Sequence, residues 1–188
     1  MLSDLRIIGD GEHAAVVRLH SQRAYLSPHR FVAIGDPRAR ESAVASDGGT
    51  EAWANVVSSA AIVSPDALGG DGIFIGPGAV VNRGAVIGRH SIVNSGAIVE
   101  HDVSLGAFVN VNPGAVIGGG AVIGQRTVLG LGCRIRDHIT IGSDVTVGMG
   151  AVVVADVPDG VTVMGCPARI CSTKPPVPPV AERIVEPK

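Results

Sequence analysis

Three polar residues stand together at Glu100, His101 and Asp102, in the stretch IVEHDVSLG where small and aliphatic residues otherwise dominate. An imidazole with a pKa of about 6.5 can accept a proton at neutral pH, and a neighbouring carboxylate stabilises the imidazolium that forms. Such a pair is a candidate general base for an amine or a hydroxyl that attacks a carbonyl carbon. It can act as one only if the fold exposes it.

The elements that must position this pair follow a six-residue repeat. From Val57 to Val153, sixteen of the seventeen residues at steps of six are aliphatic, and no insertion breaks the phase. The residue after each is often glycine, and the fourth residue after it is small or β-branched. This period predicts short parallel strands on the flat sides of a triangular coil, with three hexads per turn and glycines at the corners. In this register His101 falls on a corner and its side chain points outward.

The composition is consistent with a thin aliphatic core. Of the 188 residues 46% are hydrophobic, only 3% are aromatic and 26 are glycine. The net charge is -2 and no basic cluster interleaves with aromatic residues, which argues against nucleic acid as a partner. No apolar run reaches about 18 residues, which argues against a membrane span. The N-terminus does not resemble a signal peptide and the chain has three cysteines, so we expect a cytoplasmic protein without a disulfide framework.

Residues 1–56 lack the period and predict a small α/β domain. The stretch LRIIGDGEHAAVVRLH predicts a strand, a glycine turn and a helix, and RFVAIGD predicts a second strand. Helical stretches are expected from Pro37 to Ala45 and around Glu51 to Val56. Glycines before a helix can receive a phosphate, but GDGEHA lacks a third glycine, so a simple turn is an equal alternative.

Residues 57–169 then form the coil domain, and residues 170–188 form a tail. The tail contains two Pro-Pro pairs, which prevent continued sheet or helix, so we expect it to run extended over the surface.

The motifs, taken in order, resemble a known family. AVIGRHSIVNSGAIVEHDVSLGAFVNVNPGAVIGGGAVIG, followed by IGSDVTVGMGAVVVADVPDGVTVMGCPAR, is similar to the bacterial hexapeptide-repeat sugar acetyltransferases, which include the bacillosamine-pathway N-acetyltransferase and the sialic acid O-acetyltransferases. GDGEHA and FVAIGDPRAR resemble two pieces of that family's nucleotide-sugar domain. The resemblance implies a mainly β fold, a left-handed parallel β-helix after a truncated Rossmann-like domain. It also implies a homotrimer with interfacial active sites.

The resemblance further implies transfer of acetyl from acetyl-CoA, as co-substrate, to the amino group of a nucleotide-linked sugar, with no metal. His101 matches the family's general base, Asp102 its acidic partner, and Gly119 an oxyanion donor through its backbone N–H. Asn94 matches a polar residue near the acceptor sugar. Because Asn94 and Asn112 are eighteen residues apart, a stacked asparagine ladder is an equal interpretation.

For CoA the resemblance implies a groove between two neighbouring prisms, where small residues let the pantetheine arm lie against the backbone. Any one of the glycines in this set can equally serve only to form a corner. The matching residues are Gly119, Gly130, Gly148, Gly150, Ala151, Gly165, Pro167, Ala168 and Arg169.

The sequence departs from the family pattern in two places. Asn110 stands where several relatives carry a second histidine that contacts the thioester; an amide can hydrogen-bond that carbonyl but cannot titrate. The N-terminal domain is shorter by about one strand-helix unit, where relatives carry an acidic nucleotide contact. Gly9, Gly11 and His13 remain as candidate acceptor-site residues. The shortening makes a small acceptor without a nucleotide a second interpretation, beside a sugar hydroxyl acceptor.

Other functions fit the sequence less well. The related γ-class carbonic anhydrases bind zinc through three histidines, but His90, His101 and His138 do not have the spacing of such a site. Cys133 falls on an inward position, and Cys166 and Cys171 lie far from His101 in the register, so we expect direct transfer without an acyl-enzyme. A non-catalytic β-helix scaffold would not need a His-Asp pair beside glycines.

Overall fold

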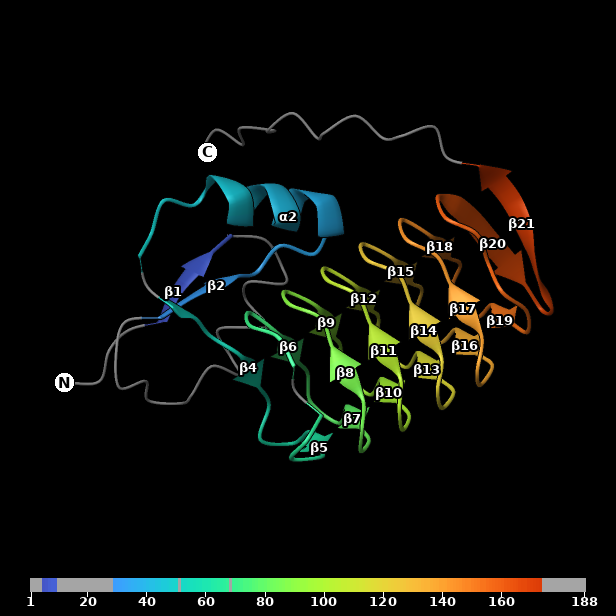
Figure 1. Ribbon diagram of the computed structural model, residues 1–188, viewed down its shortest axis with the longest axis horizontal. Helices are drawn as coiled ribbons and strands as arrows, with labels where there is room; N and C mark the ends of the chain where they lie inside the picture. The colour runs from blue at the N-terminus through green and yellow to red at the C-terminus, as the bar shows by residue number, and fades with distance from the viewer. Residues whose placement is uncertain (1–4, 10–28, 51, 68, 174–188) are drawn as a thin grey trace, which may run out of the picture.

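The structure is a computed structural model that describes residues 5–9, 29–50, 52–67 and 69–173. Most of them form a left-handed parallel β-helix of about six turns, and a small α/β cap lies at its N-terminal end (Figure 1). The fold class predicted from the sequence is therefore confirmed. No described helix is both long and apolar enough to cross a membrane.

The β-helix has three faces, each a parallel sheet of short strands. The first face contains β4 (Val56–Val57), β6 (Phe74–Ile75), β9 (Ile92–Val93), β12 (Asn110–Val111), β15 (Val128–Leu129), β18 (Thr146–Val147) and β20 (Val161–Gly165), with β21 (Ala168–Thr173) added antiparallel to β20. The second face contains β5 (Ile62–Val63), β7 (Val80–Val81), β10 (Ile98–Val99), β13 (Val116–Ile117), β16 (Arg134–Ile135) and β19 (Val152–Val153). The third face contains β8 (Val86–Ile87), β11 (Ser104–Leu105), β14 (Val122–Ile123) and β17 (Thr140–Ile141).

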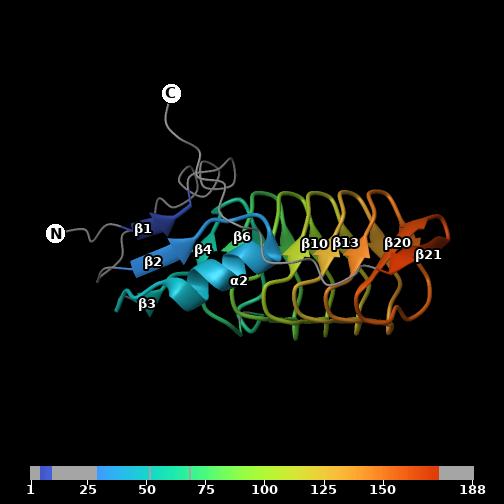
Figure 2. The same cartoon turned by 90° about the horizontal axis from the view of Figure 1, so that it is seen from above.

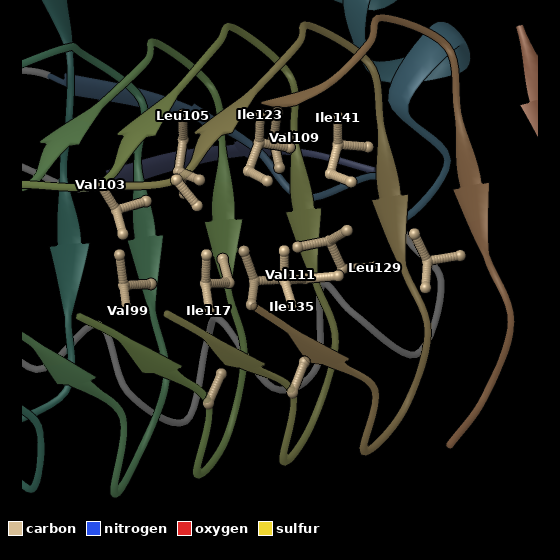
Figure 3. Close-up of a cluster of buried hydrophobic side chains, with 14 of the residues drawn as sticks. Val99, Val103, Leu105, Val109, Val111, Ile117, Ile123, Leu129, Ile135 and Ile141 are labelled. Carbon is tan, nitrogen blue, oxygen red and sulfur yellow. The ribbon is translucent and has the colours of Figure 1, made fainter. Parts of the chain in front are cut away.

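The strands pair in a register of one eighteen-residue coil. Ile98 lies opposite Val80 in the coil before and Val116 in the coil after. Every aliphatic residue of the six-residue series from Ile75 to Val153 is buried, and these side chains fill the prism (Figure 3). Gly69 is the member of the series that is not aliphatic, and among the described residues the third face begins only at β8.

The cap consists of a three-stranded parallel sheet and one described helix. Its strands are β1 (Leu5–Ile8), β2 (His29–Val32) and β3 (Ala52–Trp53), and the helix α2 spans Pro37–Ser46. The helix begins as the sequence predicts, because Asp36 accepts a hydrogen bond from the Ala39 N–H (2.8 Å) and proline occupies the first turn. The cap covers the first face, where Phe31 packs with outward residues of β4, β6 and β9 (Figure 2).

Two features of the flanking segments differ from prediction. The helical stretch expected around residues 51–56 is wrong, because β3 pairs with β2 and β4 already belongs to the coil. The strand conformation puts the Trp53 ring under the Arg30 guanidinium, 4.0 Å from the ring centre. At the other end β21 runs to Thr173, past residue 170 where the tail was expected to begin. The helix expected near Glu12 and the Pro-rich stretch lie outside the described residues.

A buried arginine fastens the cap to the coil. Arg40 of α2 donates hydrogen bonds to the carbonyls of His90 (2.8 Å) and Phe108 (3.1 Å) and to the Asn110 side-chain oxygen (2.6 Å). It also donates to the carbonyls of two cap residues that precede α2. Burial lowers the pKa of Arg40 to about 10, with Asp36 opposing the shift, so the group stays charged at neutral pH. An unpaired charge at this depth would be costly, so these bonds fix α2 against the corner between the third and first faces.

His90 is buried beneath this contact. Its ring stacks on Phe108 (centroids 5.2 Å apart) and meets the edge of Trp53 (4.9 Å). The Nδ1 atom has no hydrogen-bond partner among the described residues. Burial, helped by Arg89 and Arg40, lowers the pKa of His90 to about 4. The imidazole is therefore neutral in the folded protein at neutral pH.

This burial predicts acid sensitivity. Between pH 6.5 and about 4 the unfolded chain binds a proton at His90 that the folded chain does not, so the free energy of unfolding should decrease as the pH falls, by up to about 3 kcal/mol. The substitution His90→Phe should remove this component. Phe108 occupies the same turn position one coil later with a similar left-handed φ (59°, against 55° at His90), so phenylalanine fits the backbone there.

Urea unfolding of both proteins at pH 6.5, 5.5 and 4.5, at one protein concentration, measures the difference. An equal dependence on pH in the wild type and in His90→Phe would show that His90 is not the source of the acid sensitivity.

Candidate active site

His101 and Asp102 lie in the turn between β10 and β11, on the corner where the second and third faces meet. The His101 Nδ1 and Asp102 Oδ2 atoms are 2.9 Å apart, and the two side chains are 53% and 60% exposed. A carboxylate only accepts hydrogen bonds, so Nδ1 is the donor and the lone pair of Nε2 is left to accept a proton. The exposure agrees with the hexad register and excludes a packing role for this histidine.

Gly119 lies one coil beyond His101 in the same turn position. A Cβ atom on Gly119 would lie 2.7 Å from both Cε1 and Nε2 of His101, so the ring extends over this residue and needs a glycine there. Among the described residues the Gly119 N–H has no hydrogen-bond acceptor, whereas the next N–H, that of Gly120, donates to the His101 carbonyl (2.9 Å). A proton acceptor thus stands beside a free backbone donor, the two groups that attack on an acyl carbon requires.

Glu100 supports the turn in a way that the sequence reasoning missed. Its Oε2 atom accepts a hydrogen bond from Asn82 Nδ2 (2.9 Å) and faces the His101 N–H at 3.4 Å. Asn82 is eighteen residues before Glu100, so the repeat register itself contained the signal that the two side chains meet. The carboxylate of Glu100 is held toward the backbone and leaves the outer surface of the corner to His101.

The other predicted CoA residues lie mainly on a different corner. Gly130, Gly148 and Gly150 occupy turns between the first and second faces, and Asn94 belongs to the same corner. A Cβ on Gly148 would lie 2.7 Å from Met164 Cγ, which precedes the β20–β21 turn. The remaining predicted residues lie at the end of β20, in that turn and in β21: Gly165, Pro167, Ala168 and Arg169. One protomer therefore carries Gly119 on one edge of the second face and this group on its other edge.

Two of the predicted CoA residues are enclosed. The Ala151 side chain is buried in the core and its N–H donates to the Gly148 carbonyl (3.2 Å), so the expectation of an outward corner is wrong. Asn110 is buried under the cap. Its side-chain oxygen accepts a hydrogen bond from Arg40, and its side-chain nitrogen donates one to the Gly35 carbonyl. That amide is occupied by the cap contact and is not available to a thioester.

The predicted acceptor residues are only partly described. Gly9 follows β1 directly with φ 114°, and a Cβ there would lie 3.0 Å from the Ala33 carbonyl oxygen, so the position requires glycine. Gly11 and His13 lie outside the described residues. Asn94 accepts a hydrogen bond from the Ser95 N–H (2.8 Å), which holds its side chain in its own turn.

Metal and thiol chemistry find little support in the described part of the chain. No group of three or more His, Cys, Asp and Glu side chains is placed there to hold a metal ion. His90 is buried on another corner than His101. Cys133 is buried inside the coil, and this burial raises the pKa of its thiol to about 12.

Comparison with known proteins gives a consistent set of solved structures, whereas no family model and no curated protein matches the chain. The acetyltransferase domain of PglB from Neisseria gonorrhoeae, in complex with acetyl coenzyme A, is 32% identical, with a TM-score of 0.83 over 88% of this chain and 98% of that one. PerB from Caulobacter crescentus, in complex with CoA and GDP-perosamine, is 33% identical, with a TM-score of 0.83 over 92% and 99%. WeeI from Acinetobacter baumannii is 30% identical, with a TM-score of 0.67 over 79% and 73%.

The contact between Gly119 and His101 predicts the effect of a single methyl group. Gly119→Ala should leave the coil intact, because the equivalent turn position already holds alanine at Ala107 and Gly119 does not need a positive φ. The new Cβ should push the His101 ring aside and break its hydrogen bond to Asp102. A crystal structure of the variant should show the Nδ1 to Oδ2 distance beyond 3.5 Å, with an unchanged melting temperature.

Gln125→Ala is the matched control, because Gln125 is exposed at the same turn position of another corner. A ring that stays in place in Gly119→Ala would contradict the requirement for glycine.

Proposed function

The chain belongs to the hexapeptide-repeat sugar N-acetyltransferases, and we propose that it transfers the acetyl group of acetyl-CoA to the amino group of a nucleotide-linked amino sugar. Two structural relatives of known ligand content, which bind acetyl-CoA or CoA with GDP-perosamine, match nearly the whole chain and support the reaction class. The observation that carries the proposal is the exposed His101–Asp102 pair beside the free N–H of Gly119.

The reaction is a direct transfer. The amine nitrogen attacks the thioester carbonyl carbon while Nε2 of His101 takes its proton, and Asp102 stabilises the imidazolium through Nδ1. The oxyanion of the tetrahedral intermediate accepts the Gly119 N–H. When the carbonyl re-forms, the carbon–sulfur bond breaks and CoA leaves. Cys133 is buried, and the exposed Cys166 and Cys171 lie at the β20–β21 turn and in β21, away from the turn that carries His101, so we propose a reaction without an acyl-enzyme.

The site belongs to an assembly, which we propose is the cyclic homotrimer that the family resemblance implies. The outward row of the second face is aliphatic in five of six positions: Ile62, Val80, Ile98, Val116, Arg134 and Val152. If three copies turn this face toward a common axis, the Gly119 edge of each meets the Gly148 edge of the next. This arrangement would unite the two halves of the CoA site that a single protomer keeps apart.

The structure and its relatives say less about the acceptor than about the acyl donor. The GDP-perosamine complex of PerB favours a nucleotide-linked amino sugar, and the cap is the part of this chain that corresponds to the family's nucleotide-sugar domain. A sugar hydroxyl, or a small acceptor without a nucleotide, is the second candidate, because the cap is shortened. The cytoplasmic location stays a prediction.

A panel of amino sugars, free and nucleotide-linked, assayed for CoA release tests the acceptor. We expect release with a nucleotide-linked amino sugar and little with the free sugars. Turnover of free acceptors alone would overturn the nucleotide part of the proposal. If no acceptor is turned over and CoA causes no thermal shift, the result would favour a non-catalytic scaffold.

His101→Ala should lower kcat by about 10² or more, because the amine then loses its proton acceptor. The exposed position of His101 predicts that the melting temperature, the oligomeric mass and the affinity for CoA stay unchanged. Steady-state kinetics, light scattering and calorimetry measure these quantities, with Gln125→Ala as the control. Unchanged kcat in His101→Ala would remove His101 from the mechanism.

A further inference from the structure

A second aspartate–histidine pair lies on the same corner as His101. Asp137 and His138 form the turn between β16 and β17, two coils beyond the turn that carries His101 and Asp102. The His138 Nε2 and Asp137 Oδ2 atoms are 4.0 Å apart, and the side chains are 74% and 63% exposed. The order of the two residues is reversed relative to the first pair.

Gly119 and Gly120 are the residues between the two pairs. A Cβ on Gly120 would lie 2.5 Å from Nδ1 and 2.8 Å from Cε1 of His138, just as one on Gly119 would meet the ring of His101. Successive coils are about 4.8 Å apart, so the two histidine backbones are separated by roughly 10 Å with the glycines midway. The two imidazoles therefore border one glycine dipeptide from opposite directions along the coil.

The proposed reaction requires a position for the sulfur that leaves, and this position can be compared with that of the second imidazole. In the tetrahedral intermediate the carbon carries the attacking nitrogen, the oxyanion, the methyl group and the sulfur. His101 fixes the nitrogen on its own side of Gly119, and the Gly119 N–H fixes the oxygen. The sulfur and the methyl group take the two remaining positions, and a sulfur that points along the coil axis away from His101 lies on the side of Gly120 and His138.

We propose that His138 donates a proton to the departing sulfur of CoA, an inference that rests on the proposed function. As the carbonyl re-forms and the carbon–sulfur bond breaks, the sulfur takes the proton of the His138 imidazolium and leaves as a neutral thiol. His138 regains a proton from water, to which it is openly exposed, and His101 releases to water the proton that it took from the amine. In each turnover His101 takes one proton from the amine and His138 gives one proton to the sulfur.

The charges around His138 suit this role. Asp137 Oδ2 lies 4.0 Å from His138 Nε2, close enough to attract an imidazolium formed there. Asp156, from the next turn along the chain, is bonded to the Thr140 N–H (2.8 Å). Asp102 bonds His101 on the far side of the glycines. His138 has φ 54°, a left-handed conformation that glycine adopts freely, and Gly84 and Gly120 already hold this turn position in earlier coils.

The test uses the full-length protein, acetyl-CoA and His138→Gly. The variant keeps the turn and removes the ring beside Gly120, so imidazole from solution can take its place. We expect kcat to fall about 10-fold to 100-fold with little change in KM for acetyl-CoA. Added imidazole should restore kcat, and when the rescue is measured at several pH values the restored kcat should follow the imidazolium concentration and not the concentration of neutral imidazole. His101→Ala should respond instead to neutral imidazole, because that position needs a base.

Thr140→Ala, an exposed change two residues away, should alter neither kcat nor KM. An unchanged kcat in His138→Gly, an effect on KM alone, or a loss of kcat that imidazolium does not restore would each overturn the assignment. If the wild type transfers no acetyl group to any acceptor, the proposed function fails. If the wild type is active, the rescue experiment decides the role of His138 alone.

Discussion

The structure depends on one constraint, the in-register stacking of eighteen-residue coils. From β8 to β17 each coil hydrogen-bonds the next along all three faces, and one bulky aliphatic residue per hexad fills the prism. Residues eighteen apart therefore stand in columns about 4.8 Å apart. A side chain at a corner has neighbours above and below that the sequence dictates, so His101 meets Gly119, and Asn82 meets Glu100, without any loop having to fold around them.

The corners also impose a backbone condition. From Gly78 to Gly150 the residue three after each buried aliphatic of the six-residue series takes a positive φ, most often as glycine, and a side chain there costs on the order of 1 kcal/mol. On the corner of His101 the residues that carry a side chain at this position with a positive φ are Asp102 and His138. On the corner under the cap they are His90, Phe108, Arg126 and Asp144, each of which bonds a residue of α2 through its carbonyl or its side chain. Strained side chains thus occur where a contact is built.

The repeat predicted the coil, the exposed His101 corner and the inward Cys133, because these features depend only on position within a hexad. The same counting puts Ala151 on an inward position, so the signal against its place in the CoA site was present in the sequence. Asn110 is different, because its burial depends on Arg40, seventy residues earlier, which no local pattern reveals. The strand at Trp53 likewise forms through pairing with β2 and contact with His90. The cap therefore resists prediction because its order comes from long-range contacts.

The position of the cap limits how the two substrates can meet. Arg40 and the cluster around Phe31 hold the cap on the first face and on its corner with the third face. His101 stands on the corner between the second and third faces, so the third face separates it from the cap, and the interior behind that face is filled by aliphatic side chains (Figure 3). An acceptor bound to the cap would therefore reach the imidazole of its own protomer only by extending across the outside of the third face. In the proposed trimer the cap of a neighbouring copy is the alternative source of the acceptor. The route that the acceptor takes thus depends on whether the aliphatic second face is an interface, which links the assembly to the catalytic proposal.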